Sequence, residues 1–467
     1  WWGIAWVLGP NINKPMDPAD AGEAFAAAQR ALATASNGTE RLYAEAIARR
    51  YAPTAPEDRK LLDEAFAEGM RGVARALPDD LDAATIQAEA LMDLSPWDYW
   101  TKSGEPKHAG LDIVAILEQV LARDPDHPGA LHYYIHAVEG SQTPQRAEWV
   151  ADRLGPLVPG AGHLVHMPAH IYLRIGRYHD ASLANEKAAL ADESYISQCR
   201  VQGFYPALYY PHNIHFLFAS ACMEGRSEMA IGAARRLVQA IDLERIPEIP
   251  PMEEFVTVPY CALARFARWD ELLAEPEPPE NLRFARGMFD HALGLALVAK
   301  GRLDEAKQRE ARIAALATQA DMRALTLVSG STAGALLEIA ALVLGAEIAQ
   351  AEARSADAIT TLQRAAELQD ALPYTEPPPW YFPIRQWLGR RQLDAGQDAA
   401  AELTFRRELV EFPHNGWSLH GLEEALRGLG RDDEAKAAQA AFETAWTLAD
   451  IRLGPGSACC GAAGAAR

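Results

Sequence analysis

The chain has 467 residues, of which 49% are hydrophobic and 23% charged, a composition that excludes an intrinsically disordered protein. Its formal net charge is -20 and no basic stripe interrupts the acidic surface, which argues against nucleic-acid binding and against attachment to a membrane surface. No uninterrupted apolar run reaches the roughly 18 residues that a membrane-spanning helix needs. The five cysteines fit neither a disulfide framework nor a zinc ribbon, so we interpret three of them as buried apolar residues and place Cys459 and Cys460 in the tail.

The first 130 residues are predicted to form helix pairs, with a capping turn at 79–82. The sequence opens at Trp1 as if in the middle of a helix, so we expect that residues are missing upstream. An aromatic segment at 95–101 follows, and two interpretations of it stay open: a loop at the entrance of a groove, or a packing plug.

A repeated Gly-Arg turn organises the rest of the chain. Each copy joins an apolar helix to a second helix that opens with an acidic residue and alanine. The spacing from Ala267 to Gly301 is 34 residues, and the spacing from Gly396 to Gly430 is again 34, the length of a tetratricopeptide repeat. The clearest copies turn at Gly176, Gly225, Gly301 and Gly430. We therefore predict an all-α, tetratricopeptide-like α-solenoid over residues 1–453 as a single body, followed by a low-complexity tail at 454–467.

Two stretches depart from the regular spacing. The distance from Gly176 to Gly225 is too long for one repeat, and we predict an inserted loop at about 192–209. The interval 302–395 must hold a further helix pair at about 333–370, connected onward by the proline-rich segment 373–379.

Histidines recur at equivalent positions of the first helix of each repeat. Three, four or seven residues separate these positions, so they share one helix face and are expected to line one concave groove. Ten residues before the turn glycine stand His166, His215, His291 and His420, with Gln386 in the fifth copy; His163 and His212 stand thirteen before it, and His170 six before it.

A preceding helix adds His132, His136 and Glu139 at spacings of four and three. Two histidines at i and i+4 are the arrangement by which one helix binds a metal ion. We predict a metal site whose ligands come from this set, with Glu139 as a carboxylate ligand or general base. All-nitrogen ligation favours copper or zinc over iron. The candidate ligands are His132, His136, His163, His166, His170, His212 and His215.

A second patch of the groove is a candidate substrate-binding surface. Arg385 offers a partner for a substrate carboxylate, and aromatic residues surround it in the sequence. The alternative, that these side chains are inter-repeat core or bind neighbouring side chains, stays open. The residues are Trp380, Arg385, Gln386, His291 and His420.

Three strings around these histidines, at 127–139, 161–172 and 209–217, together with 94–100, resemble a family of bacterial tetratricopeptide-repeat proteins with histidine-rich motifs. The resemblance covers most of the chain. It implies the repeat fold and no particular reaction, and it suggests export to the periplasm and a preceding half-repeat.

Two functions follow. The first is a metal-binding protein, a hydrolase or oxidase with its metal in the groove. The second is a non-catalytic binding module that captures a peptide or a small acidic ligand, with the histidines as hydrogen-bond donors or a pH-sensitive clamp. The sequence leaves the metal, the substrate and the oligomeric state undetermined.

Overall fold

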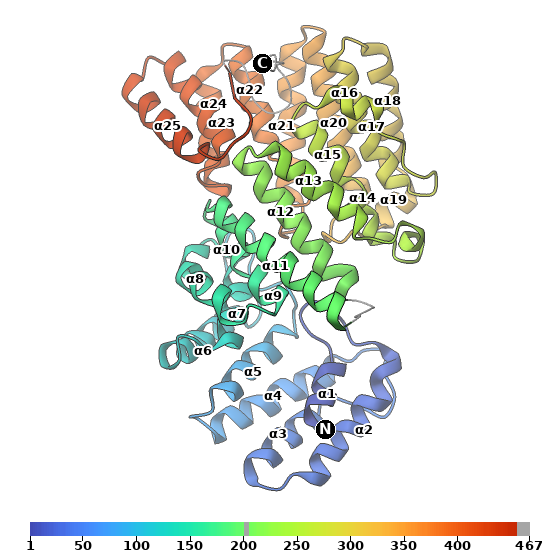
Figure 1. Ribbon diagram of the computed structural model, residues 1–467, viewed down its shortest axis with the longest axis vertical. Helices are drawn as coiled ribbons and strands as arrows, with labels where there is room; N and C mark the ends of the chain where they lie inside the picture. The colour runs from blue at the N-terminus through green and yellow to red at the C-terminus, as the bar shows by residue number, and fades with distance from the viewer. Residues whose placement is uncertain (200–204, 455–467) are drawn as a thin grey trace. The chain divides into compact units, whose positions relative to one another are not determined.

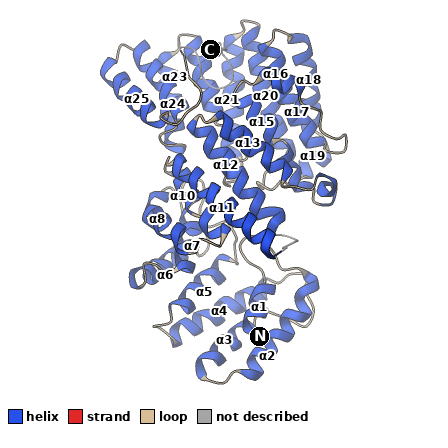
Figure 2. Cartoon of the chain, in the orientation of Figure 1, coloured by secondary structure: helices blue, strands red, loops and turns tan. Residues whose placement is uncertain are grey.

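The computed structural model describes residues 1–199 and 205–454. Within these ranges the chain is helical, with three isolated bridges and no strand, as Figure 2 shows. The chain divides into two compact units, Trp1–Val158 and Pro159–Arg467. The predicted all-α class is confirmed. The prediction of one continuous body over 1–453 stays a prediction.

The first unit is a stack of helix hairpins (Figure 1). Asp80 caps one of its helices by accepting a hydrogen bond from the Ala83 N–H at 3.1 Å, which confirms the capping turn expected at 79–82. The helices of this unit are α1 (Trp2–Leu8), η1 (Pro18–Asp20), α2 (Ala21–Thr34), α3 (Gly38–Ala48), α4 (Lys60–Ala76), α5 (Leu81–Met92), α6 (Gly110–Arg123), α7 (Pro128–Val138), η2 (Pro144–Ala147) and α8 (Glu148–Leu157).

The second unit continues the same pattern of paired helices (Figure 1). Its helices are α9 (Gly162–His166), α10 (Pro168–Arg174), α11 (Tyr178–Cys199), η3 (Tyr205–Tyr209), α12 (Tyr210–Glu224), α13 (Ser227–Gln239), η4 (Leu243–Glu248), η5 (Pro250–Met252), α14 (Glu253–Val256), α15 (Val258–Arg265), α16 (Trp269–Ala274), α17 (Arg283–Ala299), α18 (Leu303–Ala317), α19 (Ala320–Ala324), α20 (Ala333–Ala351), α21 (Ser355–Ala371), α22 (Ile384–Asp394), α23 (Asp398–Glu411), α24 (Gly416–Gly428) and α25 (Asp432–Ala445).

The Gly-Arg turns end the first helix of each pair as expected. The turn glycines have left-handed backbone, with φ of +80° at Gly176 and +73° at Gly301. The next N–H then reaches back to the helix, as the Arg302 N–H does to the Leu297 carbonyl at 2.8 Å, which satisfies a terminal carbonyl. Repeated helix pairs closed by this turn make the chain tetratricopeptide-like, as the sequence predicts.

Two alanines occupy the position of the turn glycine. Ala267 has a φ of +54° and Ala353 a φ of +61°. Ala267 belongs to the degenerate copy that the period predicts. Ala353 joins α20 to α21 and marks a copy that the glycine pattern missed, because no glycine stands there. A Cβ atom makes left-handed backbone unfavourable by about 1–2 kcal/mol, so both turns are strained.

We expect Ala353→Gly to stabilise the protein by about 0.5–1 kcal/mol, because glycine adopts the left-handed turn without a Cβ clash. Thermal or denaturant unfolding measures the change. Ala311→Gly is the matched control: Ala311 is exposed in the middle of α18, so glycine there should cost about 0.5–1 kcal/mol. Equal signs for the two variants would contradict the interpretation of this turn.

The region after Gly176 differs from the prediction. We predicted a loop at about 192–209, but α11 continues to Cys199, so residues 192–199 are helical. The buried Asp192 accepts a hydrogen bond from the Asn213 side chain at 2.7 Å, which joins this extension to α12. Residues 205–209 form η3, and 200–204 of the predicted loop lie outside the described residues.

The helix pair at 333–370, the proline-rich linker and the cysteines were also predicted from the sequence. The pair predicted at 333–370 is confirmed as α20 and α21, and the segment 373–379 links α21 to α22. Cys222 and Cys261 are buried as expected, whereas Cys199 is exposed, contrary to the prediction. Residues 455–467 of the predicted tail, with Cys459 and Cys460, lie outside the described residues.

Among the described helices, α20 alone is long and apolar enough to pass as a membrane span. Glu338 and Glu347 interrupt its apolar run, which is why a search for uninterrupted runs does not detect it. Its most apolar window has a mean hydropathy of 1.5, and 72% of that window is buried inside the protein. This burial is typical of a core helix.

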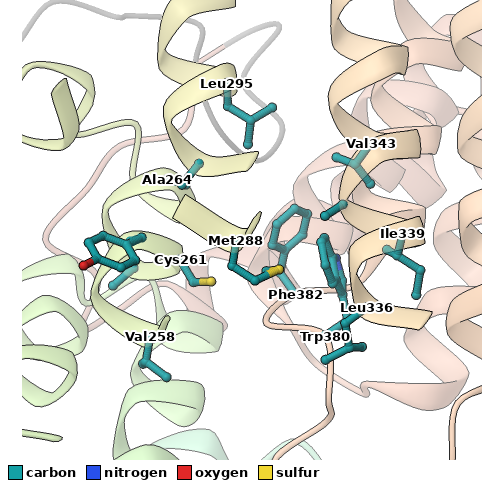
Figure 3. Close-up of a cluster of buried hydrophobic side chains, with 14 of the residues drawn as sticks. Val258, Cys261, Ala264, Met288, Leu295, Leu336, Ile339, Val343, Trp380 and Phe382 are labelled. Atoms are coloured by element: carbon teal, nitrogen blue, oxygen red, sulfur yellow. The ribbon is translucent and has the colours of Figure 1, made fainter. Parts of the chain in front are cut away.

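The core of the second unit gathers around α15, α17 and α20. Figure 3 shows Trp380 and Phe382, from the segment that follows the proline-rich linker, among apolar side chains of these helices such as Met288 and Leu336. Trp380 is 1% exposed. The linker is therefore held against the core at its carboxyl end.

Candidate metal centre

The interrupted helix formed by α9 and α10 carries the first two histidines of the site. Pro168 has no N–H, so the helical ladder breaks at Met167 and restarts with proline in the first turn. His166 ends α9 and His170 follows one turn later in α10. Pro168 therefore stands at a helix start, and both imidazoles keep the i, i+4 relation.

Three imidazole rings of the second unit converge. The Nε2 atom of His166 lies 2.9 Å from Nε2 of His170 and 3.1 Å from Nε2 of His212, which stands in the first turn of α12. His166 is fully buried, His170 is 4% exposed and His212 is half-buried. Three ring nitrogens therefore face one point, and we call these residues the three-histidine cluster.

The tautomer of His166 is set by Asn185 on α11. The Asn185 amide nitrogen donates to the Ala181 carbonyl at 2.8 Å, so its Oδ1 atom faces the other way as an acceptor. This Oδ1 lies 2.7 Å from His166 Nδ1, which must therefore carry the proton. In the neutral ring, the Nε2 atom of His166 then presents a bare lone pair to the cluster.

Glu376 places a carboxylate beside the outer ring nitrogen of His170, at an ion-pair distance rather than in a hydrogen bond. One of its carboxylate oxygens lies 3.3 Å from His170 Nδ1. A carboxylate only accepts, which favours a proton on Nδ1 and leaves Nε2 of the neutral ring bare. Glu376 comes from the proline-rich linker and is 7% exposed, so a buried carboxylate lies directly behind the cluster.

These contacts create an electrostatic problem inside the cluster. With both protons on Nδ1, neutral His166 and His170 direct two lone pairs at each other over 2.9 Å, whereas a proton on Nε2 of His170 would make this contact a hydrogen bond. Two acceptors at that distance repel unless a cation or an added proton lies between them. A metal ion satisfies all three Nε2 atoms together, and an ion held by histidines with a carboxylate behind one ring is a common protein arrangement.

Burial and charge both disfavour protonation of His166. Burial lowers the pKa of His166 well below its ordinary value, and repulsion from His170, His212 and His163 lowers it further. Phe216 packs against the cluster from α12, with ring centroids 5.0 Å from His166 and 4.9 Å from His170. The site is thus dry on this side, and His166 is held in the neutral form that ligates metals.

The other predicted ligands of the second unit lie apart from this point. The His163 ring is 6.2 Å from that of His166 and packs on Tyr209 at 4.9 Å. His215 stacks on Phe218 at 6.0 Å and contacts Phe255 at 5.4 Å, and burial lowers its pKa to about 4. The His215 ring therefore packs against aromatic rings rather than beside the three ring nitrogens, and its role as a metal ligand stays a prediction.

The first unit holds the remaining predicted residues. His132 and His136 have ring centroids 4.8 Å apart on α7, as their spacing predicts. His136 Nδ1 lies 3.0 Å from Glu139 Oε1, and both side chains are 1% exposed. Metal binding by His132 and His136, with Glu139 as a ligand or base, stays a prediction.

The predicted substrate patch is occupied by internal contacts. Arg385 forms a two-bond ion pair with Asp370 at 2.5 and 2.8 Å. Gln386 accepts from the Arg265 guanidinium at 2.8 Å. His291 is bonded through both ring nitrogens, to the Ala340 carbonyl at 2.9 Å and to the Tyr381 hydroxyl at 3.0 Å. These contacts suit structural roles, and substrate binding by these residues stays a prediction.

His420 and Trp380, the last two residues of the predicted patch, also make contacts within the protein. His420 lies 3.0 Å from the Glu424 carboxylate and 3.3 Å from the Gly454 carbonyl. Trp380 belongs to the core. The patch predicted from Arg385 is therefore largely paired within the protein.

Two residues that contact the three-histidine cluster were not predicted from the sequence. Asn185 and Glu376 hold His166 and His170 from outside, and neither stands near a histidine in the sequence. Glu376 lies in a proline-rich linker, where a carboxylate is ordinarily solvated. Only the fold brings these two side chains behind the cluster.

Comparisons with known proteins return matches among solved structures alone. No protein-family model matches the chain, and no curated protein does. Solved structures that match include the human IFIT1 dimer with m7Gppp-AAAA (12% identity, 93% of this chain and 87% of that chain, TM-score 0.35). They also include the APC/C hetero-tetramer Cut9–Hcn1 (11%, 90% and 90%, 0.32) and yeast Tom70 (13%, 92% and 92%, 0.29).

Proposed function

We propose that the second unit binds one transition-metal ion through the Nε2 atoms of His166, His170 and His212. The observation that carries this proposal is the meeting of three ring nitrogens, one of which has its proton held on the far side of the ring by Asn185, while a Glu376 carboxylate oxygen lies 3.3 Å from the far nitrogen of a second ring. Zinc lies about 2.0–2.1 Å from histidine nitrogen, and three such ligands leave a position for water or substrate. The all-nitrogen set suits Zn²⁺ or Cu²⁺ better than iron.

An ion held in this way would supply the chemistry of a hydrolase or an oxidase, since an open position polarises a bound group or lowers the pKa of bound water. The protein contributes orientation: Asn185 and Glu376 fix the ring planes, and Phe216 excludes water from one side. Outer partners of this kind raise the basicity of ligating histidines.

A second candidate is the non-catalytic binding module. Stacked helix pairs form extended binding surfaces in repeat proteins. An added proton would also satisfy the cluster, because doubly protonated His170 could donate to both His166 and Glu376. The two candidates differ in whether a metal ion or a proton occupies the cluster.

Elemental analysis of purified, untagged protein tests the first candidate. We expect about one equivalent of zinc or copper per chain, lost on chelation together with thermal stability and restored by adding the ion. Metal-free protein that takes up neither ion on reconstitution would leave the proton-based binding module as the better account.

A further inference from the structure

The first unit contains a pocket that the metal proposal does not use. It lies where the connection between α1 and η1, residues 10–15, meets the amino end of α4 and the segment that follows α5. Its volume is about 350 Å³, far more than the roughly 10–15 Å³ that one water needs and within the range of about 300–1,000 Å³ typical of small-molecule sites. The pocket therefore has room for a small organic molecule.

Hydrogen bonds within the first unit hold the walls of the pocket in place. The backbones of Asn11 and Lys14 bond to each other in both directions, at 2.9 and 3.1 Å, which closes the turn that forms one wall. The buried Arg50 guanidinium donates to the Pro10 carbonyl at 2.8 Å and to the Asp93 carboxylate at 2.5 Å, which ties this turn to the end of α5. Walls fixed in this way need little ordering when a ligand binds, so less binding energy is lost.

Trp97 supplies an aromatic wall. Its backbone lies in the left-handed region, with a φ of +63°, an unfavourable conformation for a bulky side chain and one that proteins retain mostly at functional sites. The indole N–H donates to the Ile12 carbonyl at 2.8 Å, and the ring makes an edge contact with His136 at 4.9 Å. His136 can cover one face of the indole at most, and 41% of Trp97 is exposed. A fixed, partly exposed aromatic ring is therefore available to a ligand in the pocket.

The two cationic residues of the pocket wall are engaged within the protein. Arg59 donates to the Asp63 carboxylate through Nε at 3.0 Å and through Nη2 at 2.8 Å, and it also donates to the Arg50 carbonyl at 3.2 Å. Lys14 has interactions of its own. Neither residue is a cation that awaits an anionic ligand.

The Asp93 carboxylate is matched in a similar way. It pairs with the buried Arg50 guanidinium, and the buried Glu89 stands one turn earlier on α5. Burial raises the pKa of both carboxyls, so near neutral pH Glu89 and Asp93 together carry about one negative charge against the one positive charge of Arg50. The pocket therefore selects neither an anion nor a cation.

Hydroxyl groups suit the polar groups of this wall, because a hydroxyl both donates and accepts. A carboxylate has about four lone-pair sites, so Asp63 can accept from a ligand hydroxyl while it stays paired with Arg59. The Asn11 Oδ1 accepts from the Asn13 N–H at 2.9 Å, which leaves the Asn11 NH₂ group as a donor.

We propose that this pocket binds a neutral pyranose sugar, whose apolar ring face packs against Trp97 and whose hydroxyl groups bond to Asp63 and Asn11. The aromatic ring selects a flat, partly apolar body, and the balanced charges select a ligand without net charge. The inference goes beyond the metal proposal and does not depend on it, because every residue of this pocket belongs to the first unit.

Ligand-observed NMR titration of the full chain with the methyl glycosides of glucose, galactose and mannose tests the inference. The corresponding uronates, which carry a carboxylate on the same ring, are the matched charged ligands. We expect at least one neutral glycoside to bind with a Kd of about 1 mM or lower, and about fivefold more tightly than its uronate, because the uronate must desolvate a charge without gaining a free cation. Chelation should leave these affinities unchanged, which separates this site from the metal site.

Four variants identify the pocket as the place of binding. Trp97→Ala should weaken the glycoside at least about tenfold, since large aromatic side chains contribute most to such contacts, and Trp97→Phe should keep part of the affinity. Trp149→Ala is the matched control: Trp149 is 44% exposed on α8 but does not line the pocket, so native affinity is expected. Asp63→Asn leaves Arg59 without its carboxylate, so the uronate should gain about fivefold relative to the neutral glycoside.

Thermal unfolding of each variant shows whether it remains folded. Absence of binding by all three glycosides in the native protein would overturn the inference, as would equal losses in the Trp97→Ala and Trp149→Ala proteins. Should Trp97→Ala fail to fold, native affinity in Trp97→Phe together with an unchanged preference in Asp63→Asn would overturn it.

Discussion

The His166→Ala protein is expected to bind zinc or copper more than about 100-fold more weakly than the native protein. Loss of an outer partner of a metal-binding histidine already costs about 10–100-fold, and His166 is the residue whose Nε2 atom contacts both other rings of the cluster. The native protein should gain about 3 kcal/mol of stability when free metal reaches 100 times its Kd, whereas the variant should gain almost none. Calorimetric titration of chelated protein and melting curves with added metal measure both effects.

His215→Phe is the control for this experiment. His215 was predicted as a ligand from its repeat position, but its ring packs on Phe218 and Phe255, so this variant should keep native metal affinity. Asn185→Ala should weaken binding by about 10–100-fold, because His166 loses the acceptor that holds its proton on Nδ1. Native affinity in both His166→Ala and Asn185→Ala would exclude the three-histidine cluster as the metal site.

The repeat pattern in the sequence predicts most of the fold for a physical reason. A left-handed turn between two helices strongly favours glycine, so most of these turns are visible in the sequence, at Gly176, Gly225, Gly301, Gly396 and Gly430. Ala353 makes the same turn at a cost and leaves no signal. The helical extension to Cys199 was missed because its polar outer face resembles a loop, and its buried contact, Asp192 with Asn213, depends on the next repeat.

The candidate site is less predictable from the sequence than the fold is. Spacing within one helix finds His166 and His170, and the neighbouring helix supplies His212. Spacing alone does not distinguish a convergent histidine such as His212 from His215, which is three residues away and packs against aromatic rings. The Asn185 and Glu376 contacts join segments distant in the sequence, so only tertiary structure shows them.

Glu408 provides the second large effect, on stability rather than on metal binding. The residue is 1% exposed on α23, and burial raises the pKa of its carboxyl to about 8 against the partial opposition of Arg385. A carboxyl whose pKa is higher in the folded than in the unfolded protein favours folding only while it is protonated. The contribution of protonated Glu408 to the free energy of unfolding is therefore complete below about pH 4.5, and it is lost as the pH rises through 8.

Glu408→Gln removes this ionisation while keeping the size and polarity of the side chain. We expect the free energy of unfolding of the variant to match that of the native protein near pH 4.5 and to exceed it by about 2–5 kcal/mol at pH 8. Glu254→Gln is the matched comparison: burial raises the pKa of Glu254 to about 7, but its carboxylate accepts the Ser329 N–H at 2.8 Å. Loss of that charged acceptor should offset the gain, so the Glu254 variant should be stabilised less. A stability difference between native and Glu408→Gln proteins that stays constant from pH 4.5 to pH 8 would show that Glu408 does not titrate in this range.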